Sequence, residues 1–453
     1  MSSHIYTPIP SLPSWPLLGN VFALRNKRLE LLQRISQQFG DIGAFHFGPR
    51  IVPVLNSPDF IRQALVEQGN LFEKTATVRA LGTPVLGNGI FLSEGEEHRR
   101  QRKILAPLFH HRRVLEYADT MTACTASLLE EWQDGTTLDL ANEMMRLTLG
   151  IISKILFDAD VAGEERELGK ALTFTFAYFA GAMTNPLRLP LSWPTPQNRR
   201  VQQALARLNA TIYRMIEDRR HSSEERRDLL SALTKARDEE QGTSLSDRQI
   251  RNEALSLFVA GHETTANALT WCWYLLSQHP NISAQMQAEG DRVLAGRLPT
   301  VADLPHLPYT LQVFKEALRL YPPVYAFTRR AMSSVLMGSY SIPKGASVVI
   351  SPYTLHRRPQ FYPEPERFNP ERFAPEQEQK LPRYAYLPFG AGAHVCLGMH
   401  FAQLEGHLLL ATMAQRLIFT YAGSSPIEPE PLLTLRPKGA VLMKVQRRKK
   451  AVS

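Results

Sequence analysis

The sequence predicts a mainly α-helical fold with small β-sheets, and three observations support this. From about Glu94 to Leu320, most windows carry apolar residues at helical spacing. Short alternating runs near both ends of the chain are typical of strands. A capping signal at Ser246 opens an unusually long periodic stretch. The 453 residues, 44% of them hydrophobic, are enough for a sizeable core.

The N-terminal part, residues 1–70, is expected to be rich in strands. Four prolines between residues 8 and 16 give it a stiff, extended lead, and an apolar helix follows near residues 28–39. The runs IGAFHF and IVPVLN indicate two strands joined at Gly48-Pro49. Ser57 then caps a helix whose first residue is Pro58.

The helical body, residues 71–320, contains the longest expected helix. Ser246 and Gln249 form a capping box, and the periodic pattern runs to His279, where Pro280 ends it. Such a helix has about 33 residues and spans roughly 50 Å at 1.5 Å per residue, enough to cross the molecule.

The region 321–453 is expected to hold strands, coil and a cysteine loop. GSYSIPKGASVVIS, residues 338–351, indicates a hairpin that turns at residues 343–345. The proline-rich residues 358–388 predict an ordered coil without regular secondary structure, and such a long coil usually serves a site. We interpret residues 1–453 as one domain.

Composition points to an intracellular soluble protein. Cys124, Cys272 and Cys396 are an odd set without paired spacing, which argues against a disulfide framework and favours the cytoplasm. The N-terminus lacks the basic start and apolar block of a signal peptide. No run approaches the roughly 18 apolar residues of a membrane span.

The net charge of +9 gathers in basic clusters at residues 98–103, 110–113 and 447–450. Such clusters suit nucleic acid, lipid or an acidic protein as partner. A solvated helix face explains them equally well.

One cysteine lies in a glycine-rich loop, LPFGAGAHVCLGMHF, ahead of an apolar-striped helix. Gly390, Gly392 and Gly398 remove side chains where a backbone turns sharply or approaches something flat. The helix N-terminus favours a thiolate at Cys396, the form that binds metal, and the Gly398 amide is placed to bond the sulfur. Phe389 is placed to shield it.

Two alternatives exist for Cys396. A lone cysteine is most often a buried structural residue. A zinc site is the other alternative, with His394, His400 and His407 as further ligands, but it lacks the close ligand pairs of zinc motifs. Neither alternative explains the glycines.

The predicted long helix carries an acid and an alcohol at its centre. In AGHETT the small pair Ala260-Gly261 leaves room, and Thr264 can bond back to the Ala260 carbonyl and bend the helix. Glu263 is costly on an apolar helix unless it has a task. The metalloprotease pattern H-E-x-x-H fails, because its last position is Ala266. A core helix weakened by glycine is the plainer alternative.

The two motifs together resemble those of the cytochrome P-450 superfamily, and the resemblance runs through nearly the whole chain. It implies haem b held between the long distal helix and the cysteine loop, with Cys396 as the axial thiolate ligand of the iron. His394 would contact a haem propionate. Ala260 and Gly261 would form the oxygen groove, where Thr264 holds dioxygen and Glu263 relays protons.

The resemblance also assigns supporting residues. His98, Arg102 and Arg329 would pair with haem propionates. Glu316 and Arg319 alone would be an ordinary weak surface pair at helical spacing. In the family such a pair joins an arginine of the proline-rich coil and braces the cysteine loop. PEPERFNPERF contains the motif twice, so Arg367 and Arg372 are both candidates, and position favours Arg372.

The implied activity is that of a haem-thiolate monooxygenase, which uses O2 to hydroxylate or epoxidise a lipophilic substrate such as a terpenoid, fatty acid, polyketide or peptide product. No reductase module follows residue 453, so a separate ferredoxin or flavodoxin with its reductase is expected as electron donor. The protein is expected to be a monomer. The basic residues near the proximal side in this fold favour such an acidic partner over nucleic acid; they are Arg99, Arg100, Lys103, Arg112 and Arg113.

The substrate pocket is expected to be apolar. Plain core packing is an equally good reading of its aromatics. A peroxygenase, isomerase or dehydratase is an alternative function, and a haem-based sensor or carrier is another; the Glu263-Thr264 pair argues against both. The expected lining comprises residues 72–92 and 174–183, Leu257, Phe258, and Val324 to Phe327.

Overall fold

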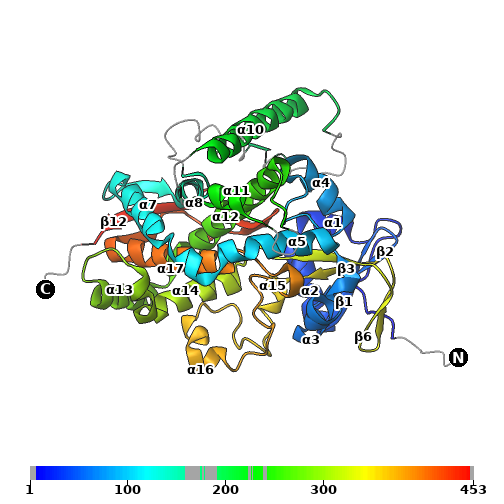
Figure 1. The fold of residues 1–453 in the computed structure, drawn as a ribbon. Coiled ribbons are helices and arrows are strands. Elements are labelled where there is room, and N and C mark those ends of the chain that lie inside the picture. The colour runs from blue at the N-terminus through cyan, green and yellow to red at the C-terminus, as the bar shows by residue number, and fades with distance from the viewer. Residues whose placement is uncertain are drawn as a thin grey trace. The chain divides into compact units, whose positions relative to one another are not determined.

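The computed structural model describes residues 7–158, 174–175, 178, 191–222, 226, 228–237 and 242–448. Its elements are mainly helices with short strands, which confirms the predicted fold class (Figure 1). The chain divides into two compact units. We call residues 1–79 with 316–396 the sheet unit, and residues 80–315 with 397–453 the helical unit. The interpretation of the whole chain as one domain stays a prediction.

The sheet unit is built on a five-stranded sheet with the strand order β1-β2-β8-β5-β3. All neighbours are antiparallel except the β2–β8 pair, which is parallel. The strands are β1 Ile42–Phe47, β2 Arg50–Leu55, β3 Phe72–Glu73, β5 Phe327–Ala331 and β8 Ser347–Ile350, and the helices are α1 Val21–Asn26, α2 Arg28–Phe39, α3 Pro58–Arg62, η1 Gln63–Glu67, η2 Gly69–Leu71, α15 Pro352–Leu355 and η6 Gly392–His394.

The local signals of the N-terminal part are confirmed. Helix α2 occupies the predicted residues 28–39, because its apolar positions form one stripe that packs into the core. The Ser57 side chain accepts the Asp59 N–H at the start of α3, with Pro58 as the first helical residue.

The predicted hairpin over residues 338–351 is wrong. Strand β7, Tyr340–Ile342, pairs with β6, Val335–Met337, across a tight turn at Gly338, whose φ is +58°. The turn at residues 343–345 exists, but it carries the chain from this ribbon into β8 of the large sheet. The residues Pro343-Lys344-Gly345 correctly indicated a turn. Which strands pair with each other, however, depends on the whole sheet.

The proline-rich residues 358–388 are not wholly without regular structure, which corrects the prediction for this coil. They contain two single-turn helices, η5 Pro370–Phe373 and α16 Pro375–Glu378, each with proline at its first position. Proline there loses no helical hydrogen bond and has a suitable φ. Asn369 caps η5 by accepting the Glu371 N–H.

The helical unit is organised around α12, Asp247–Gln278, which starts with the predicted capping box and ends two residues before Pro280. Helices α8 and α17 pack against α12, and α7 packs against both (Figure 1). The other helices are α5 Gly95–Leu105, η3 Ala106–Phe109, α6 His111–Leu115, α7 Ala118–Glu131, α8 Leu140–Phe157, α10 Pro196–His221, α11 Leu229–Lys235, α13 Pro280–Leu294, η4 Val301–His306 and α17 Met399–Arg416; α4 Ala76–Leu86 and α14 Pro308–Leu320 straddle the division.

Two small sheets complete the helical unit. One has the order β4-β12-β9 and the other pairs β10 with β11, all antiparallel. Helix α17 approaches α14 closely, because a Cβ at Gly406 would lie 2.3 Å from the Phe314 ring. The strands are β4 Thr137–Asp139, β9 Leu417–Tyr421, β10 Pro429–Pro431, β11 Leu435–Pro437 and β12 Leu442–Arg447.

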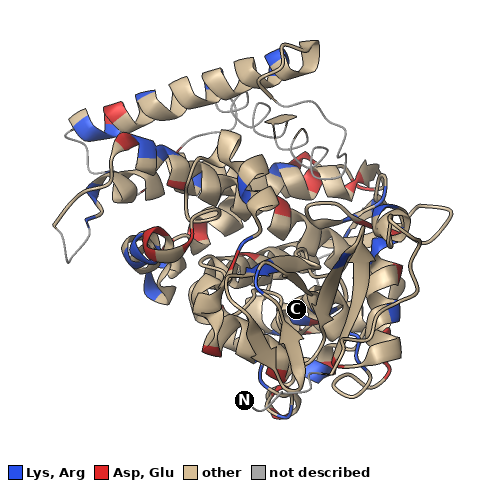
Figure 2. Ribbon diagram, turned by 90° about the vertical axis from the view of Figure 1, so that its right-hand side faces the viewer, with Lys and Arg blue, Asp and Glu red and all other residues tan. Residues whose placement is uncertain are grey.

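Within the described part of the chain, no helix is both long enough and apolar enough to span a membrane. Lysine and arginine are scattered along the ribbon together with aspartate and glutamate rather than forming a single block (Figure 2). Of the third basic cluster, residues 449 and 450 lie outside the described residues.

Candidate functional site

In the sheet unit, the residues that surround Cys396 form a closed, glycine-rich loop. Cys396 is exposed, and its N–H donates to the Phe389 carbonyl (2.8 Å), which closes the loop. Gly390 and Gly392 have φ values of +71° and +70°. A Cβ at Gly392 would lie 1.8 Å from the Leu65 carbonyl oxygen, so only glycine fits there.

His394 lies in the same loop, and a lysine reaches it from a distant part of the chain. Lys74 Nζ is 3.1 Å from His394 Nδ1. The two residues are 320 positions apart, so no sequence pattern could have paired them. This lysine is a further cation beside the predicted propionate contact.

Below the loop, Glu316 and Arg319 form a fully buried ion pair. Arg319 Nε and Nη2 lie 2.6 and 2.8 Å from the two Glu316 oxygens, and both side chains are 0% exposed. The helical spacing alone suggested a weak surface pair, which is wrong, because the coil of residues 356–369 covers it. Arg319 Nη1 donates to the carbonyls of His356 (2.9 Å) and Pro365 (2.7 Å).

The coil supplies one arginine side chain to this pair. Arg372 Nε lies 3.4 Å from Glu316 Oε1, and its Nη2 donates to the Pro363 and Glu364 carbonyls. Arg367 directs its side chain to Glu364 instead and offers only its carbonyl to Arg319. The geometry therefore puts Arg372 in the cluster.

His356 connects the buried ion pair to the start of the cysteine loop. The Leu387 N–H donates to His356 Nε2 (2.8 Å), and His356 Nδ1 lies 3.2 Å from the Arg319 carbonyl. Burial, reinforced by the Arg319 cation, lowers the pKa of His356 to about 3. The neutral ring can thus accept at one nitrogen and donate at the other.

The remaining sheet-unit candidates lie on or near β5. Arg329 Nη1 donates to the Thr328 carbonyl (3.0 Å), and the guanidinium lies 5.0 Å from the Phe327 ring centre. Val324 is exposed and Phe327 is half-buried. Their assignment to a substrate pocket stays a prediction.

In the helical unit, α12 has an open strip at its centre. Ala260 is exposed and Gly261, Glu263 and Thr264 are half-buried, whereas nearly every other residue from 250 to 276 is buried. Thr264 Oγ1 donates to the Ala260 carbonyl (2.7 Å), as the sequence suggested. Between Ile250 and Leu276, the accessible surface of this helix is therefore confined to Ala260, Gly261 and the acid-alcohol pair.

A neighbouring helix supports this opening. Thr148 Oγ1 on α8 lies 3.0 Å from the carbonyl oxygens of both Met144 and His262, and His262 Nδ1 bonds the Phe258 carbonyl (3.0 Å). The side chains of Thr148 and His262 thus bond backbone carbonyls of the opened segment. The sequence analysis missed Thr148, because it lies 114 residues from His262.

Two buried side chains, Thr434 and Glu405, form hydrogen bonds next to the acid-alcohol pair, with Glu263 and Thr265 respectively. Thr434 donates its hydroxyl to Glu263 Oε1 (2.5 Å). Glu405 on α17 is hydrogen-bonded to Thr265, and its Oε2 has no partner. Burial raises the pKa of Glu405 to about 8, so this carboxyl is mostly protonated at neutral pH.

The remaining helical-unit candidates have different surroundings. His98 on α5 is 5% exposed, and Arg102 is half-buried on the same helix. Leu257 is 9% exposed, whereas Phe258 is 0% exposed and stacks against Phe157 and His262, as a core residue does. Most of the apolar segment 174–183 lies outside the described residues.

The zinc alternative for Cys396 is wrong. Within the described ranges, no group of three or more histidine, cysteine or acidic residues could hold a metal ion. His407 Nε2 instead bonds the Leu307 carbonyl (2.8 Å), and burial lowers the pKa of His407 to about 4.

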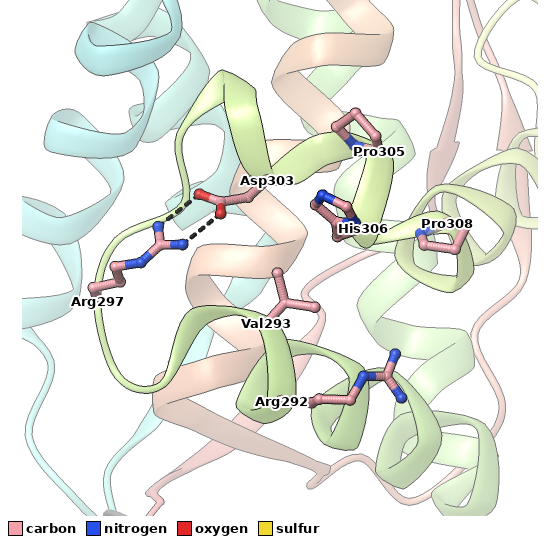
Figure 3. Close-up of a pocket in the computed structure, with 7 residues that line it drawn as sticks. All are labelled: Arg292, Val293, Arg297, Asp303, Pro305, His306 and Pro308. Carbon is pink, nitrogen blue, oxygen red and sulfur yellow. Dashed lines mark hydrogen bonds and ion pairs between the residues drawn. The ribbon is translucent and has the colours of Figure 1, made fainter.

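A surface depression of about 590 Å³ beside α13 contains none of the predicted site residues (Figure 3). Arg297 and Asp303 cross its rim as a two-pronged ion pair, with contacts of 2.5 and 2.6 Å. These hydrogen bonds hold the pKa of Asp303 well below its usual range. The charges of Arg297 and Asp303 therefore offset each other, while Arg292 adds a positive charge to the lining.

Comparison with known proteins decides the family. The family model described as cytochrome P450 matches residues 9–443. The chain belongs to the cytochrome P450 family. It is 37% identical to cyclooctatin synthase of Streptomyces melanosporofaciens, over 93% of this chain and 92% of that protein.

A second relative and a solved structure agree. Cyclooctat-9-en-7-ol 5-monooxygenase of the same organism is 34% identical, over 89% of this chain and 87% of that protein. The crystal structure of the cytochrome P450DA heme domain has 27% identity and a TM-score of 0.90, covering 98% of this chain and 99% of that one. The chain is therefore a haem-binding P450 monooxygenase.

We predict that Glu405→Gln changes the pH dependence of stability. Folded Glu405 holds its proton up to about pH 8, whereas an unfolded glutamate releases it near pH 4.3. Stability of the parent should therefore fall, relative to the variant, by about 1.4 kcal/mol per pH unit between these values. Urea unfolding of both proteins from pH 5 to 8 measures the difference, and parallel curves would contradict the buried protonated carboxyl.

Proposed function

We propose that Cys396 is the axial ligand of haem b and that this site hydroxylates or epoxidises a cyclic, lipophilic terpenoid. The observation that carries the proposal is the exposed cysteine in a glycine-rich loop, in a chain whose central helix is accessible at an acid-alcohol pair. Haem supplies the activation of O2 when it is bound.

The residues present fit this cofactor. Among the residues that the structure describes, no group of three or more histidine, cysteine or acidic side chains could hold a metal ion, so a thiolate at Cys396 suits a metal whose other ligands come from a macrocycle. Gly392 allows the loop to press on the Leu65 carbonyl, and the buried Glu316–Arg319 pair fixes the loop's base through His356. We propose His98, Arg102, Arg329 and His394 as propionate contacts, with Lys74 as an additional cation near His394.

Each residue of the open strip has a task in this proposal. Ala260 and Gly261 leave room beside the helix, and Thr264 positions oxygen and water with its hydroxyl. Glu263 takes a proton from solvent and passes it inward. Phe389 shields the sulfur, and the Gly398 amide tunes its electron donation.

The substrate class follows from a relative's name together with the apolar candidates in this chain. Cyclooctat-9-en-7-ol denotes an unsaturated cyclic alcohol. Leu257, Val324 and Phe327 are the apolar positions that we assign to contacts with such a molecule. Phe258 has no exposed surface, so we assign it a packing role within the helical unit.

The other assignments are proposals that rest on the sequence. They are a cytoplasmic monomer, a ferredoxin or flavodoxin with its reductase as electron donor, and no role for nucleic acid. A peroxygenase or isomerase would have no need of Glu263 and Thr264 in the open strip, and neither would a sensor, so we rank monooxygenation first.

We predict that the purified protein, given a surrogate ferredoxin, its reductase, reduced nicotinamide and a cyclic terpene alcohol, forms a product heavier by one oxygen atom. In Thr264→Ala, nicotinamide oxidation should continue while product falls about tenfold or more, because proton delivery becomes uncoupled from substrate oxidation. Mass spectrometry and peroxide assays measure both quantities. Unchanged coupling in the variant would contradict the role of Thr264.

A basic surface on α5 and α6 is the proposed docking face for the electron donor. It surrounds a depression of about 700 Å³ lined by Lys103, His110, Arg112 and Arg113 among others. Lys103 and Arg112 are exposed, and Arg113 forms an ion pair with Glu116 (2.6 Å). Exposed cations of this kind attract an acidic protein over a Debye length of about 10 Å at 0.1 M salt.

We predict that Lys103→Glu and Arg112→Glu slow the first electron transfer about tenfold at low salt and flatten its dependence on ionic strength. The matched control is Arg207→Glu, an exposed arginine on α10, which should leave both properties unchanged. Stopped-flow reduction by the ferredoxin measures the rate. A rate that is independent of salt in the parent protein would rule out this docking face.

A further inference from the structure

Three side chains on one face of α12, at positions i, i+4 and i+8, reach the segment that leads into β11. The Thr434 hydroxyl donates to Glu263 Oε1 (2.5 Å), and Asn267 Nδ2 donates to the same hydroxyl (3.0 Å). Trp271 Nε1 donates to the Leu435 carbonyl (3.1 Å). The helical spacing places all three donors or acceptors in one row.

The arrangement fixes the direction of the Thr434 hydroxyl. A hydroxyl has one proton and two lone pairs. Because the Asn267 amide donates to the oxygen, the single proton of Thr434 is directed to the carboxylate of Glu263. Thr434 and Asn267 are each 5% exposed, so bulk water does not compete for these bonds.

Two contacts besides those of Thr434 join the residues around the β10–β11 ribbon to the helix. The Leu435 contact uses a backbone carbonyl, which any residue at that position provides. The Ile427 N–H also donates to the Tyr274 hydroxyl (3.1 Å), further along α12. Unlike these two contacts, the side chain of Thr434 binds the Glu263 carboxyl group.

We propose that Thr434 is a positioning residue for proton delivery, which holds the Glu263 carboxylate at the open strip of α12. Asn267 acts behind it by fixing the hydroxyl. The inference rests on the proposed function, in which Glu263 takes a proton from solvent and passes it inward. Thr434 itself gains and loses no proton in this cycle.

The test compares Thr434→Val, which keeps the shape but removes the hydroxyl, with Thr434→Ser, which keeps the hydroxyl. Product formed per nicotinamide oxidised should fall about fivefold in the valine variant and return to within about twofold of the parent in the serine variant. The spectral dissociation constant of the substrate should stay unchanged in both. Thr412→Val, which removes a buried hydroxyl on α17, is the matched control and should keep parental coupling.

A second measurement does not depend on turnover. The melting temperatures of Thr434→Val, Glu263→Leu, which removes the acceptor, and the double variant form a cycle. Because both changes remove the same hydrogen bond, the double variant should lose less than the sum of the two single losses. Additive losses would show that the Thr434–Glu263 bond has no energetic weight and would overturn the inference.

Three activity results would also overturn the inference: parental coupling in the valine variant, a serine variant as poor as the valine one, or substrate affinity that weakens as much as coupling does. If instead the parent protein forms no product with any donor, the proposed function fails. The melting cycle still decides in that case whether Thr434 holds Glu263.

Discussion

The buried ion pair between Glu316 and Arg319 is the interaction on which the cysteine loop depends. Both side chains are fully buried, and removal of one partner from such a pair typically costs about 3–5 kcal/mol, because the other charge is left without compensation. Arg319 Nη1 donates to the backbone carbonyls of His356 and Pro365, at and near the start of the proline-rich coil. The His356 side chain then accepts the Leu387 N–H, and this bond holds the first residue of the cysteine loop against the coil.

The helical unit faces a comparable constraint at its centre. Between Ile250 and Leu276, helix α12 is buried except at Ala260, Gly261, Glu263 and Thr264. An acid at such a place needs hydrogen-bonding partners. Three other elements provide polar contacts around it, from Thr148 on α8, Glu405 on α17 and Thr434 before β11. The conformation of the segment Ala260–Thr264 therefore depends on contacts from other elements as well as on Gly261.

Features with a local cause could be predicted from the sequence. The caps at Ser57 and Ser246, the stripe of α2 and the loop glycines each follow from neighbouring residues, and the structure has them where they were expected. The partner of β7 could not be predicted, because pairing depends on the completed sheet. The spacing of Glu316 and Arg319 alone does not reveal their burial, since surface pairs have the same spacing; only the family resemblance indicated that the pair braces the cysteine loop.

The polar residues around the site were hidden for a different reason. Thr148, Thr434 and Lys74 lie 114, 171 and 320 positions from the residues that they contact. None belongs to a motif, and threonine is common at the surface and in helices alike. Glu405 lay within a helix that the sequence did predict, but its protonation depends on complete burial, which composition does not reveal.

The identity of the iron ligand is the central claim, and one spectrum tests it most directly. The reduced protein, exposed to carbon monoxide, should show the red-shifted Soret band that gives the P450 family its name. Cys124→Ser should keep that band, whereas Cys396→Ser should lose it while still binding haem. A band retained in Cys396→Ser would contradict the account.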